Sequence, residues 1–282
     1  MNNSSNIRDR GHVTCIYFSA FITTTMGIIS IAAFIGNTLV ITAVYRTPRL
    51  RTSTNYYYVN MAVSDLICSI TTWPLYLTDE IITSTGSVIQ GPLATIGCQI
   101  GVYSRMVSQS VSILSLVAIS ISRFIAIVLP LTANLLTSKL RVVLVAAIWV
   151  LSLAYCVSDI LFSRVEKVGH VTSCIFTWVG LGVLIYDLIS IVIFHVAPVV
   201  TIIVIYFRVM RVLLSRMKPE YVRKASNFEN KRNEQNKNIM KTFISIVLVL
   251  VICFLFYSLY FALQAPLQNF LLKDKCKITL AF

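Results

Sequence analysis

Six long apolar stretches constrain the fold of this chain more than any other feature of its sequence. A hydrocarbon core about 30 Å thick requires roughly 20 apolar residues at about 1.5 Å of rise each. Six segments meet this length: Ile16 to Tyr45, Tyr56 to Leu77, Ile96 to Leu129, Val142 to Phe162, Val179 to Phe207 and Phe243 to Leu263. Hydrophobic residues make up 57% of the 282 residues and charged residues only 12%, which excludes an ordinary soluble domain. We therefore predict an all-α integral membrane protein.

The distribution of Lys and Arg predicts how these spans are oriented. Loops 46–55, 130–141 and 208–242 hold 15 Lys and Arg, whereas the segments on the other side hold seven. Positive loops stay in the cytoplasm, so the N-terminus is expected outside, and Asn2 and Asn3 each begin an Asn-x-Ser sequon there. The net charge of +13 then reflects orientation and attraction to anionic membrane lipid, and not nucleic-acid binding.

The same pattern divides the chain into three parts. Residues 1–15 are expected to form an extracellular tail, residues 16–263 the helical bundle, and residues 264–282 the last outer loop with the start of another span. Ile278 to Phe282 turns apolar again. We interpret this end as a seventh span left incomplete by the gene model, in preference to a natural product with six spans.

Seven cysteines fall into two groups by their expected depth. Three lie within spans, where a small buried apolar role is expected: Cys68, Cys156 and Cys253. Four lie at outer positions, where oxidising conditions preserve disulfides: Cys15, Cys98, Cys174 and Cys276. Their positions favour a bridge from Cys98 to Cys174 across the mouth of the bundle and leave Cys15 and Cys276 as a second pair, although sequence alone does not fix the connectivity.

Polar residues at membrane depth are the first candidates for function, because burying them in lipid is costly. Asn37, Asp65 and Ser112 lie nine to eleven residues from the predicted inner ends of their spans, which places all three roughly 13 to 17 Å deep. A carboxylate, an amide and a hydroxyl at the same level can form a hydrogen-bonded cluster with a purely structural role. With water they can equally hold a small cation such as sodium. No dedicated metal-ligand cluster is present in the sequence.

Several short motifs occur in an order and at a spacing typical of one family. They are Gly36-Asn37-Thr38-Leu39-Val40, Asn60-Met61-Ala62-Val63-Ser64-Asp65-Leu66, Ser122-Arg123-Phe124 followed by Pro130, then Trp149, Pro198 and Tyr206. With Cys98 and Cys174, they make the chain resemble the rhodopsin-like (class A) G-protein-coupled receptors. The resemblance implies a seven-helix receptor bundle, of which six complete spans are present, in the plasma membrane.

The resemblance also implies partners and roles. An extracellular ligand and a heterotrimeric G protein are the expected partners, and a receptor dimer is compatible with the fold. The residues Ser122, Arg123 and Phe124 form the inner-end motif through which Arg123 would reach the G protein, with Tyr206 as its partner on the fifth helix. Asp65 with Ser112 would form a sodium-sensitive switch, and Cys98 would pair with Cys174.

Three departures from the family pattern change these expectations. Ser122 stands where the family usually has Asp or Glu, so the carboxylate that restrains Arg123 in the resting state is missing. Cys253-Phe254-Leu255-Phe256 replaces the Cys-Trp-x-Pro motif of the sixth span, so that helix should be straighter. The seventh span and its Asn-Pro-x-x-Tyr motif are absent from this sequence, so little signalling is expected from these 282 residues alone.

The class of ligand is suggested by the outer part of the third span. Arg105 occupies a level at which receptors for amines carry an Asp, and it would repel an ammonium group. It is expected either to pair with a nearby acid (Asp79, Glu80, Asp159 or Asp187) or to bind a ligand carboxylate or peptide carbonyl. The remaining predicted ligand-binding residues are Gln109, Tyr76, Asp187, Tyr257 and Tyr260. A peptide or a small non-amine ligand fits this lining.

Two other functions remain open at this point, and neither is enzymatic. A membrane partner that associates with full receptors without signalling is the main alternative. A small transporter is less favoured, because transporters show internal repeats or broken helix pairs.

Overall fold

A computed structural model describes residues 2–85, 91–129, 137–168, 171–178 and 180–216, together with single helical residues at 231, 234, 238, 241, 244, 245, 248 and 252. Its helices are α1 (Asn2–Arg46), α2 (Ser53–Thr85), α3 (Pro92–Val128), α4 (Ser138–Tyr155), α5 (Val157–Phe162), α6 (Leu181–Ile191) and α7 (Ala197–Arg216). A short 3₁₀ turn, η1 (Pro48–Leu50), links α1 to α2, and a π-helical turn, η3 (Val192–Val196), links α6 to α7.

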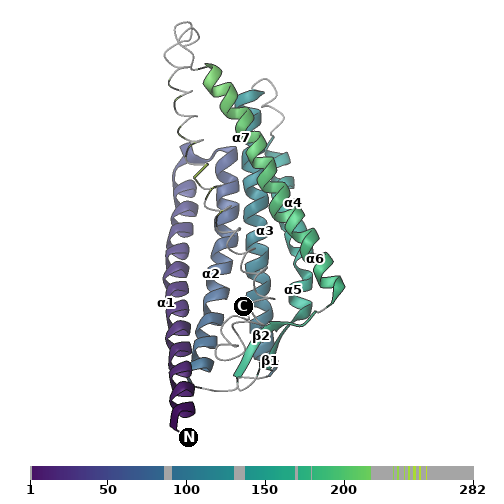
Figure 1. Cartoon of the computed structure of the whole chain (residues 1–282). Helices are drawn as coiled ribbons and strands as arrows, with labels where there is room; N and C mark the ends of the chain where they lie inside the picture. The colour runs from purple at the N-terminus through teal and green to yellow at the C-terminus, as the bar shows by residue number, and fades with distance from the viewer. Residues whose placement is uncertain are drawn as a thin grey trace.

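The long helices stand side by side, with α3 in the middle (Figure 1). Helix α3 contacts α2, α4, α5 and α7. Helix α1 makes substantial contact with only one of the other long helices in the described structure, α2. Buried apolar side chains join α3 to its neighbours through Tyr57, Leu116, Ile119 and Ile202. Because of this central position, a polar residue on α3 can form hydrogen bonds with neighbouring helices on three sides.

Four of the described helical segments are long and apolar enough to cross a bilayer: Thr23–Arg46, Pro92–Val128, Ser138–Phe162 and Leu188–Ser215. The predicted second span, Tyr56 to Leu77, lies inside α2 but is less apolar than these four because it carries Asn60, Ser64, Asp65 and several Thr and Ser. The predicted sixth span lies almost wholly outside the described residues.

Three predicted spans differ in detail from the helices. Helix α1 begins at Asn2 and so continues through the segment predicted as a tail. The fourth span is divided at Cys156, where α4 ends and α5 begins. The fifth span contains the turn η3, in which the Ala197 N–H donates to the Val192 carbonyl five residues earlier. Pro198 follows at once and lacks an N–H, so the regular ladder is interrupted here for a physical reason.

A β-hairpin follows α5, in a segment for which the sequence analysis predicted no strands. Strands β1 (Ser163–Val168) and β2 (Val171–Phe176) are antiparallel, with Ser163 opposite Phe176 and Val168 opposite Val171. The hairpin lies at the same end of the bundle as the N-terminus (Figure 1). We call this the hairpin end, and we call the opposite end, where residues 46–55 and the start of α4 lie, the basic end.

Candidate functional site

A row of serines on α3 faces α2 and forms a polar seam between the two helices. Ser104, Ser108, Ser112 and Ser115 recur at spacings of four and three residues, which places them on one face of the helix. The Asp65 carboxylate accepts hydrogen bonds from Ser108 Oγ and Ser112 Oγ, both at 3.1 Å between oxygen atoms. The charged group of α2 is therefore satisfied by two hydroxyls of α3, as a polar group at membrane depth requires.

The seam continues above and below Asp65. Thr71 and Ser104 hydroxyls are hydrogen-bonded to each other on the hairpin side. On the basic side, Asn60 Nδ2 donates to Ser115 Oγ at 2.9 Å, while Trp149 Nε1 donates to Asn60 Oδ1 at 2.7 Å. Asn60 thus ties three helices, α2, α3 and α4, through one buried amide.

The structure places Asp65 and Ser112 together, but it separates Asn37 from them. Asn37 Nδ2 donates to the Ala33 carbonyl of its own helix at 2.9 Å. Asn37 still lines, with Asp65, a cavity of about 330 Å³ between α1 and α2. The sequence analysis missed Ser108, although its position one helical turn from Ser112 was a usable signal.

The residues around Asp65 fit a small hard cation. Each serine hydroxyl gives its hydrogen to Asp65 Oδ1 and keeps lone pairs, so one carboxylate and two hydroxyl oxygens can act as ligands beside the cavity. The described part of the chain contains no group of three His, Cys, Asp or Glu that could hold a transition metal.

At the basic end, the predicted coupling residues fall into two pairs. Ser122 is buried and donates to the Ala118 carbonyl of its own helix at 2.8 Å, so its hydroxyl is not turned to Arg123. The buried Arg123 Nε has no hydrogen-bond partner among the residues that the structure describes.

Phe124 and Tyr206 form the second pair. Both pack against the apolar cluster that joins α3 to α7, which consists of Ile127, Val209 and Leu213. Tyr206 therefore lies at the α3–α7 junction, and its role as the partner of Arg123 stays a prediction.

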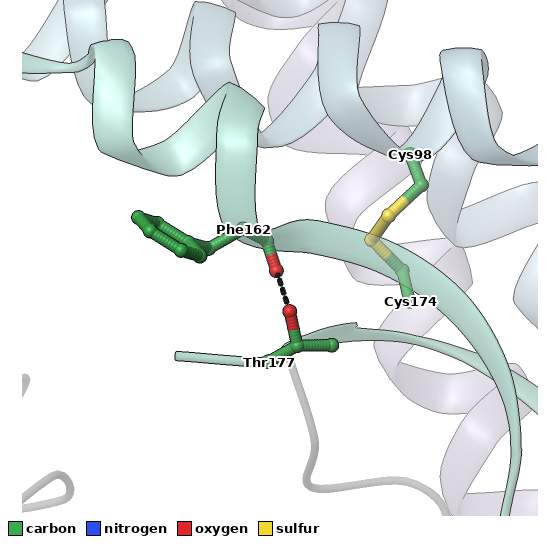
Figure 2. Close-up of a disulfide and its surroundings, with 4 residues drawn as sticks. All are labelled: Cys98, Phe162, Cys174 and Thr177. Carbon is green, nitrogen blue, oxygen red and sulfur yellow. Dashed lines mark hydrogen bonds between the residues drawn. A yellow bond between two sulfur atoms is a disulfide. The ribbon is translucent and has the colours of Figure 1, made fainter. Parts of the chain in front are cut away.

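At the hairpin end, Cys98 and Cys174 form the predicted disulfide, with 5.7 Å between their Cα atoms (Figure 2). The bridge ties strand β2 to the first turns of α3. Thr177 adds a second connection, because its backbone N–H and its Oγ1 both donate to the Phe162 carbonyl at 2.8 Å. The hairpin is thus held at its base by Thr177 and in the middle of β2 by the disulfide. Cys15 and Cys276 remain a predicted pair, since Cys276 lies outside the described residues.

Stacked aromatic rings continue this connection into the fifth span. Phe162 stacks on Trp178 with 4.8 Å between ring centroids, and Trp178 lies 5.5 Å from Tyr186. Tyr155 lies 5.6 Å from Tyr186 and 3.9 Å from Phe194, which belongs to the turn η3. The sequence analysis did not identify these rings, because their contacts join five separate segments.

The predicted ligand cavity is only partly described. Arg105 is partly buried on α3 and makes no ion pair with any residue in the described ranges, and Gln109 lies one turn further along the same helix. Asp159 is buried on α5. The other predicted residues cannot be placed as side chains within the described structure: Tyr76, Asp79, Glu80, Asp187, Tyr257 and Tyr260. Their roles stay predictions.

Residues 36–281 match the family described as 7 transmembrane receptor (rhodopsin family). The chain belongs to this receptor family. Membership confirms the resemblance and the predicted helical membrane fold, and it excludes an enzyme and a transporter, because the family consists of receptors.

Similar receptors are found in several animals. The Tachykinin-like peptides receptor 86C of Drosophila melanogaster is 30% identical over 248 residues, which cover 83% of this chain and 47% of that protein. The Substance-K receptor of Bos taurus is 28% identical over 237 residues, covering 83% and 59%. The QRFP-like peptide receptor of Branchiostoma floridae is 26% identical over 239 residues, covering 82% and 60%. The receptor chain spans less than two thirds of the length of these relatives.

Proposed function

We propose that this receptor binds an extracellular peptide and signals through a heterotrimeric G protein at the plasma membrane. The observation that carries the proposal is that its relatives include a tachykinin-like peptides receptor and a QRFP-like peptide receptor, matched over more than four fifths of this chain. The hairpin at the mouth, held by Cys98–Cys174, provides an outer rim that such a ligand can contact.

The proposed peptide contacts centre on Arg105. A guanidinium group donates in its own plane to a carboxylate or a carbonyl and repels an ammonium ion. The second proposed contact is Gln109, and the predicted wall of the cavity adds Tyr76, Asp187, Tyr257 and Tyr260. This set matches a peptide ligand better than an amine.

Binding experiments test this proposal directly. The probes are labelled tachykinin-like peptides, with either an amidated or a free C-terminus, and labelled biogenic amines. Peptide binding should weaken about tenfold in Arg105→Gln, since a hydrogen bond to a charged group contributes about 1.5 to 3 kcal/mol. Arg49→Gln, which removes the same charge at the basic end, is the matched control. Saturable binding of amines without binding of any peptide would contradict the proposal.

G-protein coupling is proposed for the region around Arg123. Ser122 supplies no carboxylate, and its hydroxyl is already bonded to Ala118, so the resting state lacks one restraint on the arginine. In a cell-based signalling assay, we expect raised signalling without ligand. Ser122→Asp should lower it, and Arg123→Ala should abolish coupling with less effect on ligand binding. If Ser122→Asp leaves the basal signal unchanged, the claim that a carboxylate at this position restrains Arg123 is refuted.

A sodium ion is proposed as the partner of Asp65. The ion would take oxygen ligands from Asp65, Ser108 and Ser112, together with water. Thermal stability should then rise in sodium chloride relative to choline chloride at equal ionic strength, and Asp65→Asn should remove the difference. An equal response of the wild type to both salts argues against a sodium site.

The orientation is proposed from the charges of the loops. Epitope tags at the N-terminus and within 208–242, stained with and without permeabilisation, distinguish the two orientations. Staining of the tag within 208–242 on intact cells would reverse the proposed topology.

A further inference from the structure

The guanidinium group of Arg123 receives no acceptor from the residues next to it on α3. Its buried Nε has no hydrogen-bond partner among the described residues, and the Ser122 hydroxyl donates to the Ala118 carbonyl. The Arg123 side chain is half-buried, so water solvates its charge only in part. A cation in this position is stabilised by an oxygen acceptor. The helices that can supply one by packing against α3 here are α2 and α7.

Helix geometry directs Arg123 toward a tyrosine of α2. Side chains of a helix lean toward its N-terminus, so Arg123 extends along α3 toward Ile119, one turn earlier. Ile119 belongs to a buried apolar cluster shared by α2, α3 and α7, and Tyr58 packs against this cluster from α2. The positive charge of Arg123 also acts on the Tyr58 hydroxyl. The guanidinium and the phenol therefore lie at one level of the α2–α3 interface.

The ring of Tyr58 is supported on one side and has free space on the other. It packs against the buried cluster, and it also lines the cavity of about 330 Å³ that contains Asp65. The ring can therefore adjust its position without displacing packed side chains. Its phenol oxygen can accept a hydrogen bond from a guanidinium, and such charge-assisted bonds are stronger than neutral ones.

We infer that Tyr58 is a positioning residue for Arg123. Its phenol oxygen accepts a hydrogen bond from the guanidinium and keeps Arg123 on the α2 side of α3 while the receptor is at rest. The inference rests on the proposed role of Arg123 in G-protein coupling, for which Tyr206 on α7 is the proposed partner. One cation then has two alternative phenol acceptors on two different helices.

This restraint differs in kind from an ion pair. Tyr58 is neutral, so Arg123 can leave it without stranding a buried counter-charge. A phenol therefore holds the guanidinium less firmly than a carboxylate does. A restraint from Tyr58 is thus compatible with the raised basal signal expected from Ser122.

The first measurement compares two adjacent tyrosines in a cell-based signalling assay without ligand. Tyr58→Phe removes only the proposed acceptor oxygen and should raise the basal signal several-fold, up to about tenfold for the loss of a charge-assisted hydrogen bond. Tyr57→Phe is the matched control, because Tyr57 is 1% exposed and its hydroxyl bonds to no described residue. The control should change the signal less than twofold. Adding Ser122→Asp to Tyr58→Phe should lower the signal again, because a carboxylate then restrains Arg123.

The second measurement does not depend on signalling. Melting temperatures of the 282-residue chain in one detergent are compared for wild type, Tyr58→Phe, Arg123→Met and the double variant. Arg123→Met keeps the apolar stem of the side chain and removes every donor. Tyr58→Phe should lower the melting temperature of the wild type by a few degrees. It should have no further effect in the Arg123→Met background, because the shared bond is already lost there.

Three outcomes distinguish the inference from its alternatives. An equal decrease caused by Tyr58→Phe in both backgrounds would overturn it, since the two side chains would then share no bond. An equal rise of the basal signal in Tyr57→Phe and Tyr58→Phe would also overturn it, because the loss of any hydroxyl would then loosen this part of the bundle. A non-additive cycle without a signal from wild type or any variant would support the bond and contradict G-protein coupling itself.

Discussion

Gly27→Ala should destabilise the receptor, whereas Gly36→Ala on the same helix should not. A β-carbon built at Gly27 would lie 2.6 Å from Trp73 Nε1, and 3.1 Å and 3.3 Å from Cε2 and Cζ2 of the same ring. A β-carbon at Gly36 would meet nothing within 4 Å. The two substitutions add the same methyl group to α1, so they differ only in what that group meets.

The expected difference follows from two opposing effects. Replacing glycine by alanine within a helix stabilises it by about 0.5 to 1 kcal/mol at either position. Overpacking at Gly27 costs about 1 to 3 kcal/mol, because the rigid indole must move as a unit. Gly27→Ala should therefore be less stable than Gly36→Ala by about 1 to 3 kcal/mol. Because both variants gain the same helix stabilisation, this gain cancels when their unfolding free energies are compared.

Unfolding free energies measured in one detergent provide the assay, and a second substitution provides the rescue. Trp73→Leu removes the ring that the new methyl group meets, beside an existing cavity of about 390 Å³. It strands no acceptor, because the buried Trp73 Nε1 has no hydrogen-bond partner in the described structure. Gly27→Ala should cost nothing further in the Trp73→Leu background. Equal stabilities of the Gly27→Ala and Gly36→Ala variants would refute the close approach of α1 and α2.

Two more predictions concern bonds that join separate elements. Cys98→Ser and Cys174→Ser should each lower surface expression, since losing a disulfide costs about 2 to 5 kcal/mol, and the double variant should be no worse than either; additive losses would show that the thiols are not partners. Trp149→Phe should reduce the unfolding free energy by about 0.6 to 1.7 kcal/mol, the range for interhelical hydrogen bonds in membranes. Because Trp149 bonds to Asn60, that cost should largely disappear in an Asn60→Ala background, and full additivity in the double-mutant cycle would contradict the shared bond.

Counting residues along the helices predicted which polar side chains lie at the same level of the bundle, but it did not predict toward which neighbour each side chain points. The fixed rise per residue of a helix places Asp65 and Ser112 at one level, and the structure joins them. The same count placed Asn37 at that level, but its amide bonds to Ala33 of its own helix. Rise says nothing about how a helix is rotated against its neighbours, so a shared level is necessary for contact and not sufficient.

The features that the sequence analysis missed depend on non-local contacts or on weak local signals. Strands β1 and β2 flank Gly169-His170 in the sequence, a glycine-containing pair typical of a two-residue hairpin turn. The sequence analysis overlooked this turn signal because the segments on either side were assigned to long apolar spans. The stacking of Tyr155 on Phe194 left no such signal, because it depends on how the fourth and fifth spans pack.

The junction of α3 and α7 shows how one departure from the family pattern can alter a conformational equilibrium. Ser122 gives its hydrogen to Ala118, and so no charged bond holds Arg123 through that residue. Near the basic end, contact between α3 and α7 is made by Phe124 and Tyr206 around a small apolar cluster. Apolar packing is non-directional, whereas breaking a buried ion pair strands a charge and costs about 3 to 5 kcal/mol. The missing ion pair would act within α3, because residues 122 and 123 are neighbours on that helix. Its absence leaves Arg123 less restrained, and the apolar contact lets α3 and α7 shift against each other without stranding a charge. Together these two features are the physical basis for expecting signalling without ligand.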